Sequence, residues 1–356
     1  RLGDLGKKVH TCRSRNDQVA VDIRLHVRNE LNALSEEVAD LAEALLAFGE
    51  TYRKIPLVGR THLQPAMPSS VGMWASAYAE MLLDDGYLLE AAAKVNNLCP
   101  LGSAAGYGVP LPIDRQLTSD LLAFDRPHHN VFYASCARGK DEAVLLAACA
   151  QIMLSLSRLA EDLILFSMPE FRYFTLPRDL CTGSSIMPQK YNPDVLELIR
   201  GKAALLLGQS TAANVILKAM PGGYNRDLQD TKELYMEGLR VTRTSLRIMK
   251  LMAENLKVNP EACRAAFAEP GVFATDRALE LVAGGMPFRD AYHQVRDHLE
   301  DLRGMDPDEV IAKKTHLGGT NGIDFAALRG RAEAFRAQAA AAQARVDAAF
   351  ASLMNV

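Results

Sequence analysis

The sequence has little of what marks a metal-binding, nucleic-acid-binding or membrane protein. Its six cysteines are scattered, with no C-x-x-C pair and no Cys/His cluster at metal-ligand spacing. The net charge is only −3, which gives no electrostatic basis for binding nucleic acid or an anionic membrane. Scattered cysteines are typical of free thiols in a reducing compartment. We therefore expect a cytoplasmic protein that binds no metal and no cofactor.

Strand-type alternation is nearly absent, and the most apolar stretch, 143–166, is interrupted by polar residues that argue against a bilayer span. Helical periodicity is present instead. Apolar residues recur at steps of four and three from Val27 to Phe48, the stripe of a long helix packed nearly parallel to its neighbours. Similar stretches predict long helices at about 70–96, 141–168, 194–218 and 227–256.

The expected fold is all-α, with a long central helical bundle and a smaller C-terminal helical domain. The bundle and its loops are assigned to 12–256. From about 257 onward the sequence changes to shorter amphipathic pieces separated by Gly and Pro, so 257–356 is predicted to form the small domain, ending in an Ala-rich helix. Residues 1–11 begin with Arg and are interpreted as the remnant of an N-terminal domain, most of which we expect to lie outside this sequence.

The most unusual stretch is the loop at 183–193, GSSIMPQKYNP. Gly183 frees the backbone, and Pro188 and Pro193 prevent it from continuing as a helix. Its polar side chains are Ser184, Ser185, Lys190 and Asn192. Gly-Ser-Ser alone is ordinary linker composition, but this order of residue types over the whole loop indicates a functional site. The loop resembles the signature loop of the fumarase/aspartase superfamily, whose members add or remove a leaving group across the double bond of fumarate.

Three further polar segments stand out. HTCRSRNDQVA at 10–20 combines two guanidinium groups with Asn and Gln, and the guanidinium fork matches carboxylates bidentately, although a solvated helix start is the plainer interpretation. GRTHLQPAMP at 59–68 places Thr61 and His62 in a Pro-bounded loop, where a lone histidine is usually only a surface residue. YNRDLQDTKE at 224–233 places Gln229 and Lys232 three apart, on one helix face.

Glu197 follows the 183–193 loop and lies beside Val195 and Leu198, on what the pattern makes the apolar face of its helix. A carboxylate on a buried face needs a partner, and a buried histidine would serve. We therefore expect Glu197 to be buried and paired.

Together these segments resemble the argininosuccinate lyase family, because RSRNDQ separates that family from fumarase, aspartase and adenylosuccinate lyase. The resemblance runs essentially from end to end and includes LGSAAGYGVPLPIDR and GMPFRDAYHQV. It implies reversible β-elimination of argininosuccinate to arginine and fumarate. It also implies a homotetramer whose long helices form a multi-helix core and whose active sites each draw on three subunits.

The resemblance also implies roles for individual residues. Ser184 matches the catalytic base, His62 matches the histidine paired with an acid at Glu197, and Thr61 is its neighbour. Lys190 is expected to stabilise the charge that develops during proton removal. The remaining substrate contacts implied by position are Ser14, Arg15, Asn16, Asn192, Tyr224, Gln229 and Lys232.

Three departures from the family pattern leave alternatives open. Cys12 stands where the family usually has Gly, Tyr191 replaces a usual Lys, and PGGYNRD differs from the commoner PLAYN. A related lyase acting on another N-substituted aspartate is one alternative. A structural protein like δ-crystallin, which belongs to the same family, is another. Intact Ser184, Lys190 and His62 weigh against a purely structural role.

Overall fold

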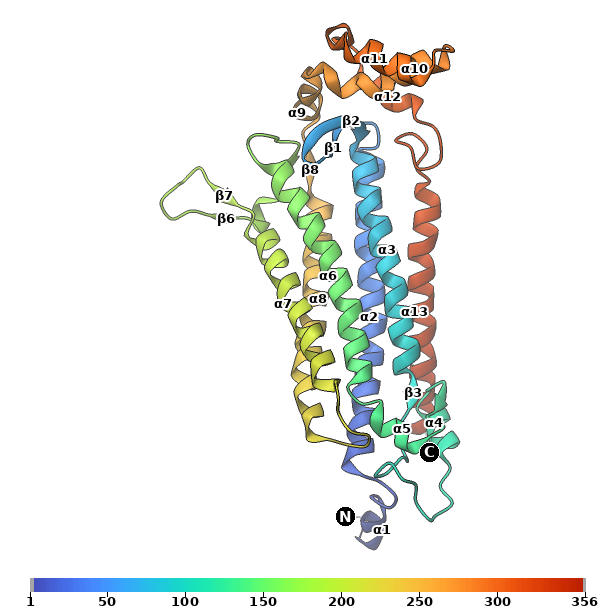
Figure 1. The fold of residues 1–356 in the computed structure, drawn as a ribbon. Helices are drawn as coiled ribbons and strands as arrows, with labels where there is room; N and C mark the ends of the chain where they lie inside the picture. The colour runs from blue at the N-terminus through green and yellow to red at the C-terminus, as the bar shows by residue number, and fades with distance from the viewer. Residues whose placement is uncertain (1–2, 355–356) are drawn as a thin grey trace.

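The computed structural model describes residues 3–354 and is dominated by a bundle of long helices (Figure 1). The bundle helices are α2 (Arg15–Thr51), α3 (Val71–Asn96), α6 (Lys140–Ser167), α7 (Asp194–Leu217), α8 (Asp230–Asn255) and α13 (Phe325–Met354). The all-α prediction is confirmed, and the expected helices end within a few residues of their predicted positions. The 37-residue helix α2 is about 55 Å long at ~1.5 Å per residue.

The apolar stripe of α2 forms the centre of the core. Every stripe residue from Val27 to Phe48 is at most 7% exposed. Helix α2 packs against α3, α8 and α13, and α6 packs against α3, α7 and α8. Gly86 of α3 makes room for α13, because a Cβ at that position would lie 2.7 Å from Cζ of Phe335. The long helices therefore share one continuous hydrophobic core.

Helix α6 is long and apolar enough to cross a membrane by length and composition alone, among the residues that the structure describes. The expectation that its polar residues rule this out was therefore wrong. However, 67% of its most apolar window is buried inside the bundle. Its apolar surface contacts other helices of this chain, as expected for an inner bundle helix.

A helical cap covers one end of the bundle (Figure 1). Its elements are α9 (Pro260–Ala265), η3 (Ala266–Ala268), η4 (Pro270–Phe273), α10 (Ala274–Ala283), α11 (Phe288–Arg296), η5 (Leu299–Leu302) and α12 (Pro307–Lys313). The cap has its own core around Phe267, Phe273 and Val295. The prediction of one small domain over 257–356 differs from the structure at its last helix. Helix α13 leaves the cap and returns along α2 and α3, because Leu328, Ala332 and Phe335 bury an apolar face in the bundle core.

Short strands join the helices at the bundle ends. The antiparallel hairpin β1 (Pro56–Thr61) and β2 (Gln64–Ser70) lies beneath the cap, and the prediction of an irregular loop there was wrong. Its base is held by the cap, since Val58 belongs to the cap core and Nζ of Lys314 donates to the Pro68 carbonyl at 2.8 Å. The other pairs are β3 (Leu98–Cys99) with β4 (Arg126–Pro127), β5 (Phe174–Thr175) with β8 (Lys257–Val258), and β6 (Thr182–Gly183) with β7 (Tyr191–Asn192).

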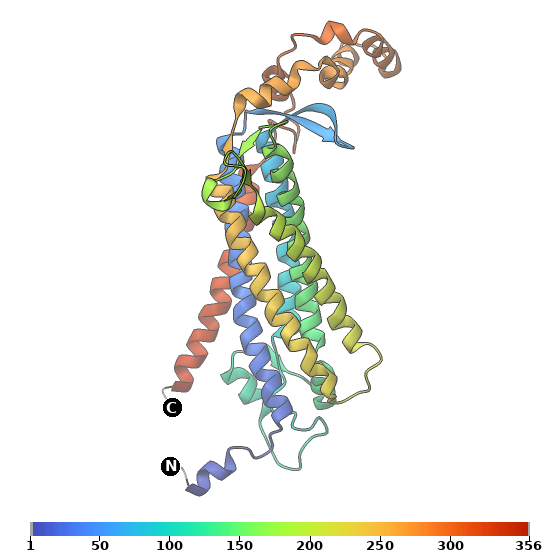
Figure 2. The same ribbon diagram turned by 90° about the vertical axis from the view of Figure 1, so that its left-hand side faces the viewer.

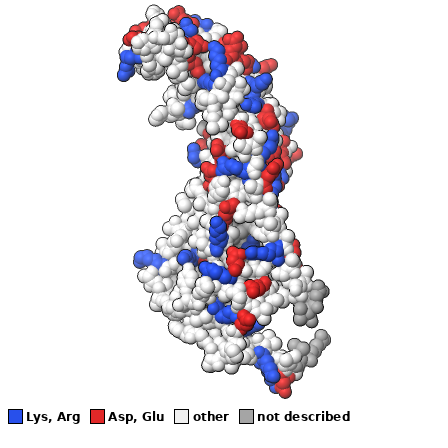
Figure 3. All heavy atoms as spheres, turned by 90° about the vertical axis from the view of Figure 1, so that its right-hand side faces the viewer, with Lys and Arg blue, Asp and Glu red and all other residues white. Residues whose placement is uncertain are grey.

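The opposite end of the bundle carries both described chain ends and several short helices (Figure 2). These helices are α1 (Gly3–Lys8), α4 (Arg115–Leu121), α5 (Val131–Cys136) and η2 (Arg226–Gln229), whereas η1 (Arg178–Leu180) leads into the β6–β7 hairpin. On the face shown in Figure 3, acidic and basic side chains are interspersed. This mixed surface agrees with the small net charge of −3.

Candidate active site

The segment at residues 13–16, called the RSRN segment below, spans the start of helix α2 at the end opposite the cap. Ser14 is the N-cap residue: its Oγ accepts the Asn16 N–H at 3.2 Å, and its own N–H donates to Oδ1 of Asp17 at 2.9 Å. This capping box gives Ser14 a structural task in addition to its predicted substrate contact. The Arg15 side chain is exposed. The solvated helix start and the predicted binding segment thus coexist in one place.

Asp17, which was not assigned a role from the sequence, links this segment to the next loop. It is 3% exposed, and its Oδ2 accepts the N–H groups of Gly102 and Ala104 at 3.1 and 2.9 Å. The loop that begins at 99 is therefore held against the start of α2. The Ser-x-x-Asp spacing of a capping box was the signal for Asp17 in the sequence.

Cys12, where the family usually has Gly, has a φ of 61°. This left-handed conformation is open to glycine at no steric cost and is strained for other residues. The structure thus explains why glycine suits this position. Cys12 adopts this conformation before α2 at a cost of about 1–2 kcal/mol.

The turn between α7 and α8 brings three predicted substrate contacts together. Nε2 of Gln229 donates to the Tyr224 hydroxyl at 2.8 Å, and Nζ of Lys232 donates to Oε1 of Gln229 at 2.9 Å. The three-residue spacing of Gln229 and Lys232 therefore does place them side by side, as predicted. A Cβ on Gly223, the residue before Tyr224, would lie 3.4 Å from the Tyr107 hydroxyl. The loop that Asp17 holds thus reaches this turn.

Arg138, which no sequence motif marked, lies behind Tyr224. Its guanidinium carbon is 4.7 Å from the Tyr224 ring centroid, and the side chain is 6% exposed. Burial lowers the pKa of Arg138 from its usual value, while Tyr224 and Glu142 act in the opposite direction. Two guanidinium nitrogens, Nε and Nη1, have no hydrogen-bond partner within the described part of the chain. The guanidinium is thus held chiefly by the aromatic face that it supports.

A buried charge network fixes the corner that carries Arg138. Arg24 of α2 forms an ion pair with Asp141 at the start of α6 and also donates to the carbonyls of Val95 and Asn96, at 3.2 and 2.7 Å. Glu142 is 4% exposed, and burial raises the pKa of its carboxyl group. Because α2, α3 and α6 are joined here, the RSRN segment and the Tyr224 turn occupy defined positions at the same bundle end.

Thr61 and His62 lie at the cap end instead, at the tip of the β1–β2 hairpin. Thr61 pairs with Gln64, so His62 and Leu63 form a two-residue loop. Their φ angles are 54° and 61°, the left-handed region expected for both central residues of a type I′ turn. Both side chains are exposed. The hairpin therefore presents His62 to solvent, away from the RSRN segment.

The 183–193 loop, called the Ser184 loop below, projects from the side of the bundle on strands β6 and β7 (Figure 1). Oγ of Ser184 accepts the N–H groups of Ile186 and Met187 at 3.4 and 3.1 Å, which turns the loop back on itself. Lys190 closes this turn by donating its N–H to the Met187 carbonyl at 3.0 Å. Tyr191, a departure from the family pattern, has its ring 4.7 Å from the guanidinium carbon of Arg178. The contact between Tyr191 and Arg178 thus stabilises the hairpin that holds Ser184, Lys190 and Asn192.

Glu197 contradicts the expectation that it is buried and paired. Leu196 and Ile199 face the core, at 0% and 3% exposure, whereas Glu197 and Leu198 are exposed. The apolar residues around Glu197 do not form a single buried face, because α7 contacts other helices of this chain on one side only. His62, on the β1–β2 hairpin, does not meet Glu197 within this chain.

The predicted site residues therefore form three separate groups. Ser14, Arg15 and Asn16 share one bundle end with Tyr224, Gln229 and Lys232. Thr61 and His62 lie at the other end, and the Ser184 loop projects from the side (Figures 1 and 2). Among residues 3–354, no three His, Cys, Asp or Glu side chains are placed to hold a metal ion.

Comparison with known proteins assigns this chain to a family. The model of a lyase family matches residues 2–208. Argininosuccinate lyase of Thermotoga neapolitana is 42% identical over 83% of this chain and 74% of that protein. The chain belongs to the argininosuccinate lyase family. The enzyme of the same name from Parabacteroides distasonis is 45% identical over 83% of this chain.

A solved lyase structure has the same fold as this chain. A crystal structure of EDDS lyase in complex with formate superposes on this chain with a TM-score of 0.89, at 25% identity, over 99% of this chain and 78% of that one. The chain spans 66% of the length of the Parabacteroides relative. The superposition on EDDS lyase covers 99% of this chain, so it includes the bundle and the cap of this lyase-family member.

Proposed function

We propose that this protein catalyses the reversible β-elimination of argininosuccinate to arginine and fumarate. The observation that carries the proposal is the 42–45% identity to two argininosuccinate lyases over 83% of this chain. The lyase-family match over residues 2–208 includes the RSRN segment and the Ser184 loop. All the residues matched by position to the family's base, histidine, acid and substrate contacts are present. Several of them, including Arg15, His62 and Lys190, are exposed on loops or helix starts, where a small molecule can reach them.

The chemistry requires a base and a charge-stabilising site. Ser184 is proposed to remove the proton from the carbon next to a carboxylate, which builds a doubly charged aci-carboxylate. Preorganised donors stabilise such charge, and Lys190 and Asn192 lie on the same hairpin as Ser184. His62 either passes a proton to the departing guanidine or binds the substrate electrostatically. Arg15 and Asn16 are proposed to bind carboxylate.

The separation of the three groups supports a homotetramer with shared active sites. Ser14 and Thr51 lie at opposite ends of α2, which is about 55 Å long, so one small substrate cannot touch both ends of one chain. The three groups meet only if several chains contribute to each site. The Glu197–His62 pair is then proposed to form between subunits, which accounts for the exposure of Glu197.

The outer face of α7 also supports association between subunits. Leu198 and Leu205, seven residues apart on one helix face, are 61% and 69% exposed. Gly201 and Gly208 lie on the same side, and a Cβ on either would meet no described atom within 4 Å. Exposed apolar faces of this kind mark protein–protein contacts. A cytoplasmic location is also proposed, on the basis of six cysteines that form no disulfide.

The test is fumarate release, measured by absorbance, when the purified protein is mixed with argininosuccinate. A panel of other N-substituted aspartates covers the second candidate, a related lyase with a different amine product. The close superposition on EDDS lyase favours keeping that candidate. Turnover of argininosuccinate above all other substrates supports the proposal. Turnover of another panel member selects the second candidate, and no turnover at all selects a structural role.

A further inference from the structure

The tip of the β1–β2 hairpin has an unfavourable sequence for its shape. Two-residue loops with both φ angles positive strongly prefer Asn-Gly or Gly-Gly, because these residues enter the left-handed region at little cost. Here the two positions are His62 and Leu63, with φ of 54° and 61°. Leucine in this region is an outlier that costs of order 1–2 kcal/mol. Contacts outside the turn must therefore hold it.

Arg60 makes those contacts. Its Nη1 donates to the Leu63 carbonyl at 3.0 Å, which closes the tip over itself. Its guanidinium carbon lies 4.8 Å from the ring centroid of Phe171, and its Nη2 donates to the Tyr173 hydroxyl at 3.5 Å. One side chain thus joins the hairpin tip to the segment that follows α6.

The anchor behind Arg60 is rigid. Tyr173 is 2% exposed, and the rings of Phe166, Phe171 and Tyr173 lie 5.4–6.1 Å from one another. The base of the hairpin is equally firm, since Val58 is buried in the cap core. Between these supports, residues 61–65 are all exposed. Arg60 is therefore the last anchored side chain before the exposed tip.

We propose that Arg60 is the positioning residue for His62: it holds the strained His62–Leu63 turn and so sets the direction in which the imidazole is presented. The catalytic part of this inference rests on the proposed function, because His62 is expected to act on substrate. The geometric part does not. Arg60 also connects the His62 turn to Phe171 and Tyr173, in the segment that continues along the chain into the Ser184 loop.

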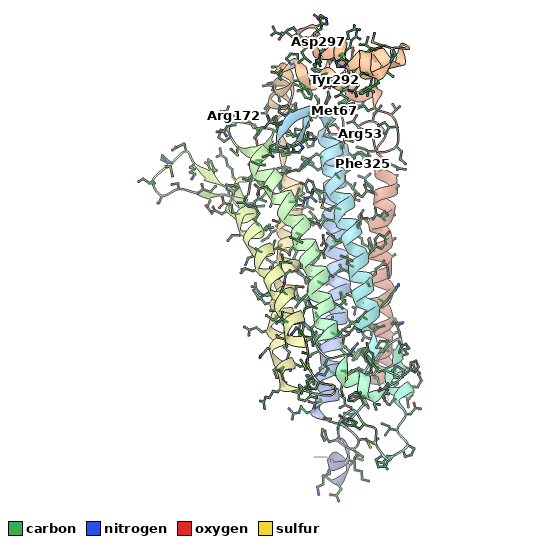
Figure 4. All side chains as sticks on the ribbon, in the orientation of Figure 1. Arg53, Met67, Arg172, Tyr292, Asp297 and Phe325 are labelled. Carbon is green, nitrogen blue, oxygen red and sulfur yellow. The ribbon has the colours of Figure 1, made fainter. Side chains whose placement is uncertain are left out.

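Hydrogen–deuterium exchange on the intact protein tests the geometric part without any activity. In Arg60→Met, the peptide covering 60–66 is expected to exchange at least about fivefold faster, because the turn loses its clamp. Arg53→Met is the matched control. Arg53 also stacks on a ring, that of Phe325 at 5.5 Å, and donates to a carbonyl, that of Asn321 at 3.0 Å, but it serves a different loop (Figure 4). It should leave the 60–66 peptide unchanged.

A second substitution distinguishes an effect on the His62–Leu63 turn from a general loss of stability. Glycine at position 63 adopts the required φ without strain, so Arg60→Met should accelerate exchange much less in a Leu63→Gly background. Equal acceleration in both backgrounds, or unchanged exchange in Arg60→Met, would overturn the inference. Either result stands whether or not the protein turns over argininosuccinate.

The kinetic part uses a double-mutant cycle. Arg60→Met is expected to lower kcat about tenfold with KM changed less than about twofold, and Arg60→Lys to recover part of the loss. In a His62→Asn background, Arg60→Met should cause no further loss, since there is no imidazole left to position. Additive losses would show that Arg60 acts independently of His62 and would overturn its positioning role.

Discussion

The guanidinium carbon of the buried Arg138 lies 4.7 Å from the ring centroid of the half-buried Tyr224, and this pair joins the α5–α6 corner to the turn before α8. This contact predicts that a substitution of Arg138 weakens substrate binding without lowering thermal stability. Arg138→Met keeps the side chain's bulk but loses the cation–π contact, so KM should rise about fivefold, equivalent to about 1 kcal/mol. Thermal stability should not fall, because two unpaired buried nitrogens are removed with the charge.

Steady-state kinetics and thermal unfolding of Arg138→Met check this prediction. Arg331→Met is the control, since Arg331 lies 5.6 Å from the Tyr87 ring, remote from the predicted substrate contacts. An unchanged KM in Arg138→Met would remove Tyr224 and Arg138 from the substrate site.

Ser184→Ala tests the proposed base. The variant should keep its fold, because Ser184 lies on a projecting hairpin outside the bundle core. Its kcat should fall by at least about 10³-fold, the scale expected when a positioned base is removed. Ser185→Ala should have a much smaller effect. Fumarate release and thermal unfolding, measured on both variants, give the answer. Near-normal turnover in Ser184→Ala would contradict the assignment of Ser184 as the base. A loss of thermal stability comparable to the loss of activity would show that the residue is structural.

Mixing two inactive variants tests the shared active site. His62→Asn and Lys190→Ala inactivate segments at the hairpin tip and on the side of the bundle. If sites combine several chains, hybrid tetramers from mixed refolding should contain some intact sites and recover part of the activity. Each variant refolded alone is the control. A monomer by light scattering, or no recovery in the mixture, would count against shared sites.

The buried carboxyl of Asp85 predicts a pH dependence of stability. Asp85 is 5% exposed and accepts a 2.6 Å hydrogen bond from Oγ of Ser155, between α3 and α6. Burial raises the pKa of Asp85 to about 6, against the effect of that hydrogen bond. The folded protein thus keeps a proton that the unfolded chain releases near pH ~4. The resulting stabilisation is complete below that pH and is lost as pH rises from about 4 through about 6, by up to about 3 kcal/mol.

Denaturant unfolding between pH 4 and 8 checks this sign. Asp85→Asn should remove this part of the pH dependence and be more stable than the parent at pH 8. Asp120→Asn, at an exposed carboxylate of α4, is the control. Parallel pH profiles for the parent and Asp85→Asn would contradict the prediction.

Helix positions were predictable because periodicity is a local property of the chain. The stripe from Val27 to Phe48 contains its own signal and is buried as expected. The β1–β2 hairpin was missed because its Pro-rich strands are held from outside, by the cap core around Val58 and by Lys314. The burial of Glu197 was predicted wrongly for a related reason. Periodicity shows which residues share a face, but not which face another element covers.

The sequence by itself determined the family and the long helices, because motifs and apolar stripes are written in neighbouring residues. It also marked the polar segments that carry the predicted site. Only the tertiary structure decided where those segments lie. A helix of 37 residues separates its ends by about 55 Å whatever polar residues it carries, so the RSRN segment and the His62 turn lie far apart in one chain. Contacts such as Arg60 with Leu63 and Arg138 with Tyr224 likewise depend on how distant segments pack, which no local pattern records.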